Sequence, residues 1–220
     1  MNKKILVIAL ASAMTSGFAV AEGVNAGIEL EVKTRVGSAA GNADSGAKIF
    51  AGYEGFGASA KSNRNSDREY NLNYKHDFDG FYLKGEYEFV DKRTSNNQQK
   101  FGISAGTNVG GYFDTSLRLR KDLDTEHKAD SNGKGDVNRF DFAVGRQFEN
   151  VYLNTKVVGQ KQNTASRVGS NAKDTIYNYE ARLTFTNIHG FTPYFEAGNE
   201  ASFDNSKRNT YGKVGVVFPF

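Results

Sequence analysis

Alternation of apolar and polar residues is the strongest pattern in the chain. In segment 24–36 the even-numbered positions are apolar or threonine, while most odd-numbered positions are polar or charged. A period of two places the two sets on opposite faces of a β-strand. The same alternation recurs in segments 81–89, 113–120, 139–144, 177–185 and 211–220. We therefore predict an all-β protein whose strands have one apolar and one polar face.

The connections between these segments are of two kinds. Tight turns with an aromatic residue nearby centre on Gly55, Gly80, Gly110 with Gly111, Asn150 and Gly190. Gly and Asn tolerate the positive φ angles of tight hairpins. Longer polar stretches alternate with these turns, at 37–46, 62–68, 91–99, 121–136, 161–174 and 201–209. Eleven connections predict twelve antiparallel strands, with the tight turns and both termini at one end.

Short turns at one end and long loops at the other are typical of outer-membrane β-barrels. The alternative is a soluble antiparallel barrel or sandwich with one wet face. Two features favour the membrane. Charges crowd one face of segment 24–36, which exceeds the roughly 9 to 11 residues that cross a bilayer, and aromatic residues gather at strand ends. We predict a twelve-stranded transmembrane β-barrel in a Gram-negative outer membrane, with short periplasmic turns and longer extracellular loops.

Residues 1–21 have the features of a cleaved signal peptide. Lys3 and Lys4 precede an apolar run, and Ala19 to Ala21 has the small-residue pattern of a cleavage site. A retained membrane anchor would need roughly 20 apolar residues, and polar residues interrupt this run too early. We expect cleavage after Ala21 and a single barrel domain over residues 22–220.

Composition and charge narrow the function classes. The chain has no cysteine, so disulfides cannot stabilise it, and its mean hydropathy is −0.57. Loss of Lys3 and Lys4 reduces the formal net charge from +3 to +1. Nucleic-acid-binding domains usually carry a clear basic excess, so no nucleic-acid partner is expected.

Three segments resemble a known family. "LRLR" (117–120), "TPYFEAGNE" (192–200) and "RNTYGKVGVVFPF" (208–220) are similar to the oligogalacturonate-specific porins (KdgM-like), which include sialic-acid-oligosaccharide channels. The resemblance implies a monomeric twelve-stranded barrel whose lumen has basic tracks that pass small acidic oligosaccharides. It also implies that the last strand, ending at Phe220, is recognised by the outer-membrane assembly machinery.

Twelve strands should leave a narrow aqueous pore, so inward-facing polar residues are the candidate pore lining. Arginine side chains suit the carboxylates of an acidic sugar. The pore-lining and substrate-binding candidates are Lys33, Arg35, Lys84, Arg118, Arg120, Arg139, Lys156, Arg182, Lys213 and Glu196. The same faces carry Glu29, Glu31, Glu86, Glu88, Asp114, Asp141, Glu180 and Glu200. The basic residues are therefore either a selectivity track or members of a structural salt-bridge lattice.

Catalysis and cofactors are not expected. His76 and His189 lie close to tight turns, and His127 lies in a loop of solvated charges. Loop 121–136 lacks the regular carboxylate spacing of a calcium site, and whether it constricts the pore stays open. We expect a passive channel without metal or cofactor that contacts outer-membrane lipids. The alternatives are a non-specific small-solute porin, a closed adhesin or structural barrel and, third, an enzyme barrel.

The closing strand allows a sharper expectation. Gly212, Val214, Val216, Phe218 and Phe220 should face lipid, while Lys213, Gly215 and Val217 face the lumen. Pro219 has no N–H group to donate to a neighbouring strand. We therefore predict that pairing with the first strand stops at or before Phe218.

Overall fold

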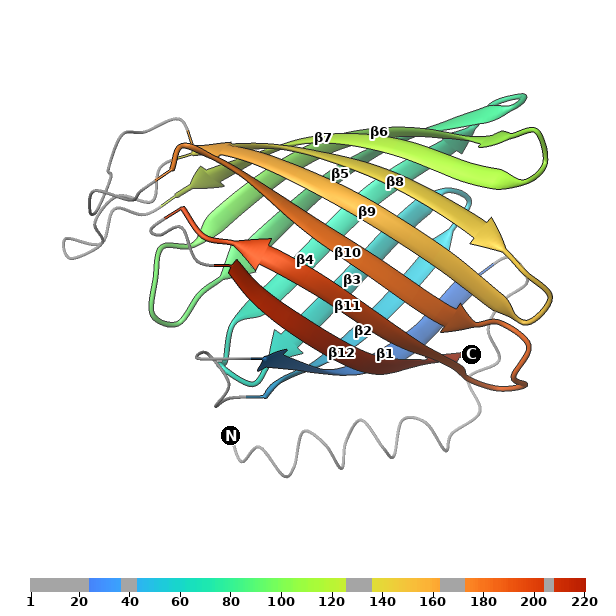
Figure 1. The fold of residues 1–220 in the computed structure, drawn as a ribbon, viewed down its shortest axis with the longest axis horizontal. Coiled ribbons are helices and arrows are strands. Elements are labelled where there is room, and N and C mark those ends of the chain that lie inside the picture. Colours follow the sequence, from blue (N-terminus) through green and yellow to red (C-terminus); the bar gives the residue numbers. More distant parts are fainter. Residues whose placement is uncertain (1–23, 37–42, 126–135, 163–172, 204–207) are drawn as a thin grey trace.

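The computed structural model describes residues 24–36, 43–125, 136–162, 173–203 and 208–220. They form one closed barrel of twelve strands in which each strand is antiparallel to both neighbours, and β12 pairs with β1 to close the ring (Figure 1). The strands are β1 (Val24–Val36), β2 (Asp44–Tyr53), β3 (Phe56–Asn63), β4 (Arg68–Asp77), β5 (Phe81–Asp91), β6 (Gln98–Val109), β7 (Phe113–Asp124), β8 (Val137–Gln147), β9 (Val151–Gln162), β10 (Thr175–Phe185), β11 (Thr192–Ala201) and β12 (Arg208–Pro219). The predicted fold class and strand number are confirmed, and the expected signal peptide lies outside the described residues.

The tight turns gather at one end of the barrel, together with the start of β1 and the C-terminus, at the right of Figure 1. Glu54 and Gly55, with φ of 45° and 87°, form the two-residue turn between β2 and β3. Positive φ is also found at Gly80, Gly110, Gly111 and Gly190, as predicted. Asn150 is not among the positive-φ residues, so the fourth turn does not use the asparagine in this way.

The predicted division into short and long connections is only partly regular. Residues 64–67 are enough to join β3 to β4 at the long-loop end, whereas residues 186–191 join β10 to β11 at the tight-turn end. Several strands also extend into stretches predicted to be loops. β7 continues to Asp124, and its last residues pair with the start of β6. Polar strand ends keep their ladder hydrogen bonds because pairing does not require an apolar face.

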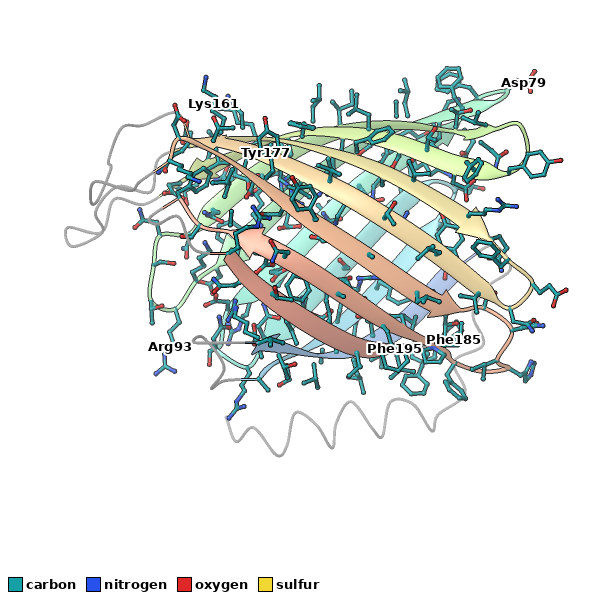
Figure 2. All side chains as sticks on the ribbon, viewed as in Figure 1. Asp79, Arg93, Lys161, Tyr177, Phe185 and Phe195 are labelled. Atoms are coloured by element: carbon teal, nitrogen blue, oxygen red, sulfur yellow. The ribbon has the colours of Figure 1, made fainter. Side chains whose placement is uncertain are left out.

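The outside of the barrel is apolar. Phe185 and Phe195 lie on the outer surface towards the tight-turn end, and Tyr177 lies on it towards the other end (Figure 2). Large apolar side chains that are more than a third exposed include Leu72, Leu83, Ile103, Leu117, Leu119, Phe142, Leu183 and Val214. A strand of 12 residues such as β6 is roughly 40 Å long, and at a tilt of about 40° it spans roughly 30 Å. The outer surface therefore matches the hydrocarbon core of a bilayer.

Two further observations concern the barrel wall. Within the described residues, no helix is both long and apolar enough to cross a membrane. The few buried apolar side chains include Val90, Val158 and Ile176, at inward-facing positions near the long-loop end. A packed apolar core does not fill the barrel, and polar contacts dominate its interior.

The prediction for the closing strand was wrong. Pro219 lies opposite Gly27 in the β1–β12 register, and the Phe220 N–H donates to the Ala26 carbonyl at 2.9 Å. Consecutive residues of a strand direct their N–H groups to opposite neighbours, so the nitrogen of Pro219 faces β11. The pairing of β11 with β12 begins at Thr192 opposite Val217, short of Pro219. No carbonyl of β11 is therefore left without a hydrogen bond by the missing N–H of Pro219.

Candidate functional site: the barrel lumen

The predicted polar faces line the inside of the barrel. Several side chains contact each other across an intervening strand, which is possible only where side chains converge on the concave face. Arg118 on β7 contacts Glu86 on β5 at 3.0 Å, and Lys33 on β1 contacts Glu200 on β11 at 2.6 Å. The odd positions of β1 and the even positions of β5 thus face inward, as their alternation predicted.

Glycines on the inner face make room for these contacts. A Cβ atom at Gly102 of β6 would lie 2.7 Å from the Glu86 side chain, and one at Gly215 of β12 would overlap the Tyr194 ring. Tyr194 crosses β12 at this glycine and donates hydrogen bonds to Glu29 and Glu31 on β1. The inward glycines thus allow long polar side chains to lie flat against the wall.

The first group of charges surrounds the junction of β10, β11, β12 and β1. The Glu196 carboxylate is 6% exposed and accepts a hydrogen bond from the Arg182 Nη2 at 2.5 Å. The Lys213 Nζ lies 2.9 Å from the same carboxylate, and the Tyr211 hydroxyl donates to it at 3.0 Å. Glu196 is therefore fully committed to donors on the two neighbouring strands, β10 and β12.

The same group continues onto β2 and β3. Tyr194 donates to Glu29 at 2.7 Å and to Glu31 at 3.1 Å. Lys48 forms an ion pair with Glu29, and Lys61 pairs with Glu31 at 2.6 Å. We call these residues the seam cluster: Glu29, Glu31, Lys48, Lys61, Arg182, Tyr194, Glu196, Tyr211 and Lys213.

A second group lies across the lumen on β5 to β8. Arg118 joins Glu86 to Asp141, with its Nε 2.7 Å from the Asp141 Oδ2, and Arg139 also pairs with Asp141 at 2.6 Å. Lys84 lies 3.7 Å from Glu86. Two more pairs complete this group, Arg120 with Asp122 at 2.7 Å and Lys100 with Glu88 at 2.5 Å.

The two signs of charge lie at different depths in these clusters. The carboxylate side chains of Glu29, Glu86, Asp141 and Glu196 are between 5% and 10% exposed. Their partners reach further into the lumen, with exposed fractions of 38% for Arg182, 32% for Lys48 and Lys84, and 25% for Arg118. In these pairs the carboxylate lies against the wall and the cation covers it. Three pairs nearer the long-loop end do not show this order: Lys33 with Glu200, Lys100 with Glu88 and Arg120 with Asp122. Lys213 and Glu31 in the seam cluster are equally exposed.

Most of the basic residues predicted from the sequence thus face the lumen and are paired there. Eight of its nine basic residues form ion pairs; these are Lys33, Lys84, Arg118, Arg120, Arg139, Lys156, Arg182 and Lys213. Lys156 pairs with Glu180 at 2.5 Å. Arg35, exposed at the end of β1, forms no ion pair with the described residues. Asp114 is not ion-paired with the described residues either, but accepts hydrogen bonds from Asn108 at 2.9 Å and from Tyr152 at 3.1 Å.

Several lining residues were missed. Lys48 and Lys61 lie on strands whose outward positions are mostly alanine or serine, so the apolar half of the alternation is weak there. Tyr194 and Tyr211 were overlooked although they share the numbering parity of Glu196 and Lys213. Parity along β11 and β12 was the signal that could have identified both tyrosines.

A cavity of about 820 Å³ runs inside the barrel between opposite walls. Seven cations line it, Lys48, Lys61, Lys75, Lys84, Lys156, Arg182 and Lys213, with five carboxylates, Glu29, Glu31, Glu54, Glu69 and Glu88. A second cavity of about 530 Å³ near the tight turns is lined mainly by Tyr, Asn, Thr and Ser side chains. Three charged residues, Lys75, Asp77 and Asp114, also line the second cavity, so charges are sparser there than in the first.

Metal and histidine chemistry have little support in the described part of the chain. Its His, Asp and Glu side chains form no group of three or more placed to hold a metal ion. His76 lies on β4 with its ring 4.6 Å from that of Phe78, and His189 lies in the 186–191 connection. His127 and most of loop 121–136 lie outside the described residues.

Comparison with known proteins gives structural matches alone. No protein-family model and no curated protein sequence matches the chain. A NanC porin structure matches with a TM-score of 0.75 at 16% identity, covering 87% of this chain and 98% of that one. A KdgM porin matches with a TM-score of 0.65 at 15% identity, covering 88% and 99%. An outer membrane channel from Pseudomonas putida F1 matches with a TM-score of 0.62 at 6% identity, covering 94% and 98%. These likenesses show that the chain has the fold of the outer-membrane β-barrels.

Proposed function

We propose that the chain is a narrow outer-membrane channel through which small acidic oligosaccharides diffuse passively. The observation that carries the proposal is the depth order of the lumen charges. In the seam cluster and around Arg118, cations extend over carboxylates that lie against the wall. Beside these pairs, a solute in the lumen therefore meets guanidinium and ammonium groups before it meets their carboxylate partners.

This arrangement suits transit better than capture. A free arginine in a narrow pore would hold a carboxylate strongly, because two parallel charge-assisted hydrogen bonds form. Here Arg182 and Arg118 already donate to wall carboxylates, so a passing anion competes for their remaining N–H groups. Conduction requires binding that is favourable but weak and repeated over several sites.

Two kinds of comparison support the substrate class. The short segments at 117–120, 192–200 and 208–220 resemble the oligogalacturonate-specific porins. One of the structurally similar proteins is a KdgM porin solved in complex with disordered oligogalacturonate, at a TM-score of 0.65 and 16% identity. Oligogalacturonate- and sialate-like oligomers are therefore the solutes to test first.

A non-specific small-solute porin is the second candidate. The observation in its favour is that most lumen cations are paired, which brings the net charge of the lining close to balance. We also propose a monomer whose last strand, ending at Phe220, is recognised by the outer-membrane assembly machinery, as the resemblance implies.

Planar-bilayer recording of the refolded full chain tests the function. In a salt gradient, we expect discrete channels with anion preference. Galacturonate oligomers should reduce the current, and neutral oligomers of equal length should reduce it much less. Equal block by both oligomers would favour the non-specific porin. Cation preference would overturn the acidic-sugar proposal, and absence of conductance would favour a closed barrel.

A further inference from the structure

One charge on the outer surface lies apart from the others. In the described strands, the outward-facing charged residues at the long-loop end are Arg68, Asp91, Lys121, Lys161 and Arg208. Arg146 lies at the opposite end, near the end of β8 and close to the 148–150 turn, where the β8 arrow ends among the tight turns (Figure 1). Its numbering parity is that of Phe140 and Phe142, which are exposed on the lipid-facing side. Among the described strand positions in the tight-turn half of the barrel, Arg146 is the one outward-facing charged residue, apart from the titratable His76.

Three aromatic rings hold the Arg146 side chain. Its guanidinium carbon lies 5.2 Å from the ring centroids of Phe113 and Phe148 and 6.0 Å from that of Tyr112. These rings are themselves exposed, with fractions of 41%, 48% and 67% for Phe113, Phe148 and Tyr112. Such contacts engage the face of a guanidinium, and its N–H groups at the edge remain available.

No described carboxylate neutralises this arginine. Glu149 is in the adjoining turn, yet no ion pair of 4.0 Å or less joins it to Arg146, and the described residues form no hydrogen bond with the guanidinium. This distinguishes Arg146 from the paired arginines of the lumen. A cation among lipid-facing aromatic side chains is unfavourable unless its head reaches the interface or an anion pairs with it.

The geometry points to a phospholipid-binding site. We propose that the Arg146 guanidinium binds the phosphate diester of a phospholipid in the leaflet at the tight-turn end, with Tyr112, Phe113 and Phe148 framing the headgroup. The planar fork of arginine matches two phosphate oxygens, and aromatic belts lie at headgroup level. The exposed rings continue the apolar outer surface, so acyl chains pack beside the bound phosphate. A free phosphate ion would leave this apolar surface unused, which favours the lipid as the source of the anion.

Native mass spectrometry of the folded full chain tests the site. Detergent-solubilised protein is titrated with phosphatidylglycerol, and the fraction carrying one lipid is measured against lipid concentration. Because one basic residue contributes about fivefold to affinity at an anionic surface, Arg146→Gln should weaken the tightest binding step about fivefold. Arg68→Gln makes the same change at the other end of the barrel and should leave that step unchanged.

Further arms separate the sources of the effect. Arg146→Lys keeps the positive charge but loses the two parallel N–H donors of the guanidinium, so it should lose less phosphatidylglycerol affinity than Arg146→Gln. Heat-modifiable gel mobility shows whether each variant folds. Arg146→Lys provides the comparison if Arg146→Gln does not fold. A phosphate-free galactosyl diacylglycerol should bind the wild type and Arg146→Gln equally. Unchanged phosphatidylglycerol binding in both Arg146 variants, or an equal loss in Arg68→Gln, would overturn the proposal. Full displacement of the lipid by millimolar inorganic phosphate would identify a free-anion site instead.

Discussion

Substituting Arg182 and its partner Glu196 one at a time should change the charge presented to the lumen in opposite directions. Arg182→Gln removes the most exposed of the ion-paired seam-cluster cations, whose side chain is 38% exposed, and leaves Glu196 with Lys213 at 2.9 Å. Glu196→Gln removes a nearly buried carboxylate of similar shape and leaves Arg182 without its ion-pair partner. The first variant should bind an acidic sugar more weakly, and the second should bind it more strongly.

The size of the effect follows from Coulomb's law in a hydrated pore. Two unit charges 4 Å apart interact by about 1 kcal/mol in water, which corresponds to about fivefold in a binding constant. Arg182 is solvent-accessible, so the low-dielectric values for buried pairs do not apply to it. We expect the concentration of galacturonate oligomer that halves the current to rise about fivefold in Arg182→Gln and to fall by a similar factor in Glu196→Gln.

The assay is single-channel block in a planar bilayer at about 0.1 M and at about 1 M salt. The Debye length shrinks from about 10 Å to about 3 Å between these conditions, so both effects should largely disappear at high salt. Arg208→Gln is the matched control, because Arg208 lies on the outer face with its guanidinium carbon 5.2 Å from the Tyr179 ring centroid. Changes of the same sign in both lumen variants, or an equal change in Arg208→Gln, would refute the reasoning.

Three further predictions concern the barrel wall, each measured as the free energy of unfolding in urea. Gly198→Val should destabilise the barrel by about 1 to 3 kcal/mol, because its Cβ would overlap the Tyr211 ring. Gly212→Ala on the next strand has open space around the added Cβ and should cost less than about 1 kcal/mol. Equal losses in the two variants would contradict this. Pro219→Val should change the free energy of unfolding by less than about 0.5 kcal/mol. Phe218→Pro should lower it by about 3 kcal/mol, because it removes an N–H donor that faces β1. A large loss on replacing Pro219 would contradict the conclusion that its nitrogen faces no ladder partner. Gly55→Ala should cost about 1 to 3 kcal/mol, because φ is 87° and the added Cβ would meet the Lys75 carbonyl. Glu54 in the same turn has a φ of 45°, so Glu54→Gly should be neutral or stabilising.

The fold was predictable because a β-strand records its two faces in numbering parity. Alternation in segments such as 24–36 identified the lipid-facing and lumen-facing sides, and the turn residues identified the number of hairpins. Strand ends were less predictable, because the alternation stops before the pairing between strands does. Asp122, near the end of β7, lies in a polar stretch and still pairs with Lys100 on β6. Pro219 was misjudged because sequence alone did not show which neighbour its nitrogen faces, nor where β11 begins.

The candidate site was predictable as a face but not as an arrangement. Parity shows that Arg118 and Glu86 point inward, yet it does not show that they meet across β6 at Gly102. That contact depends on register between strands and on a glycine in the strand between them. Lys48 and Lys61 were missed because most outward residues of β2 and β3 are small, so the apolar signal that reveals a strand is faint there.

Selectivity and structural pairing were treated from the sequence as competing roles for the lumen cations, but the geometry removes the conflict. A barrel lined by arginine and lysine alone would be strained by repulsion between cations on neighbouring strands, as at Lys33 opposite Lys213. Neighbouring carboxylates relieve that repulsion, since Lys213 lies 2.9 Å from Glu196 and Lys33 lies 2.6 Å from Glu200. Around Arg182 and Arg118 the carboxylates are covered, so their negative charge stabilises the wall while positive groups face the solute. We therefore propose that the depth of each charge, which parity cannot encode, lets one set of ion pairs serve both roles.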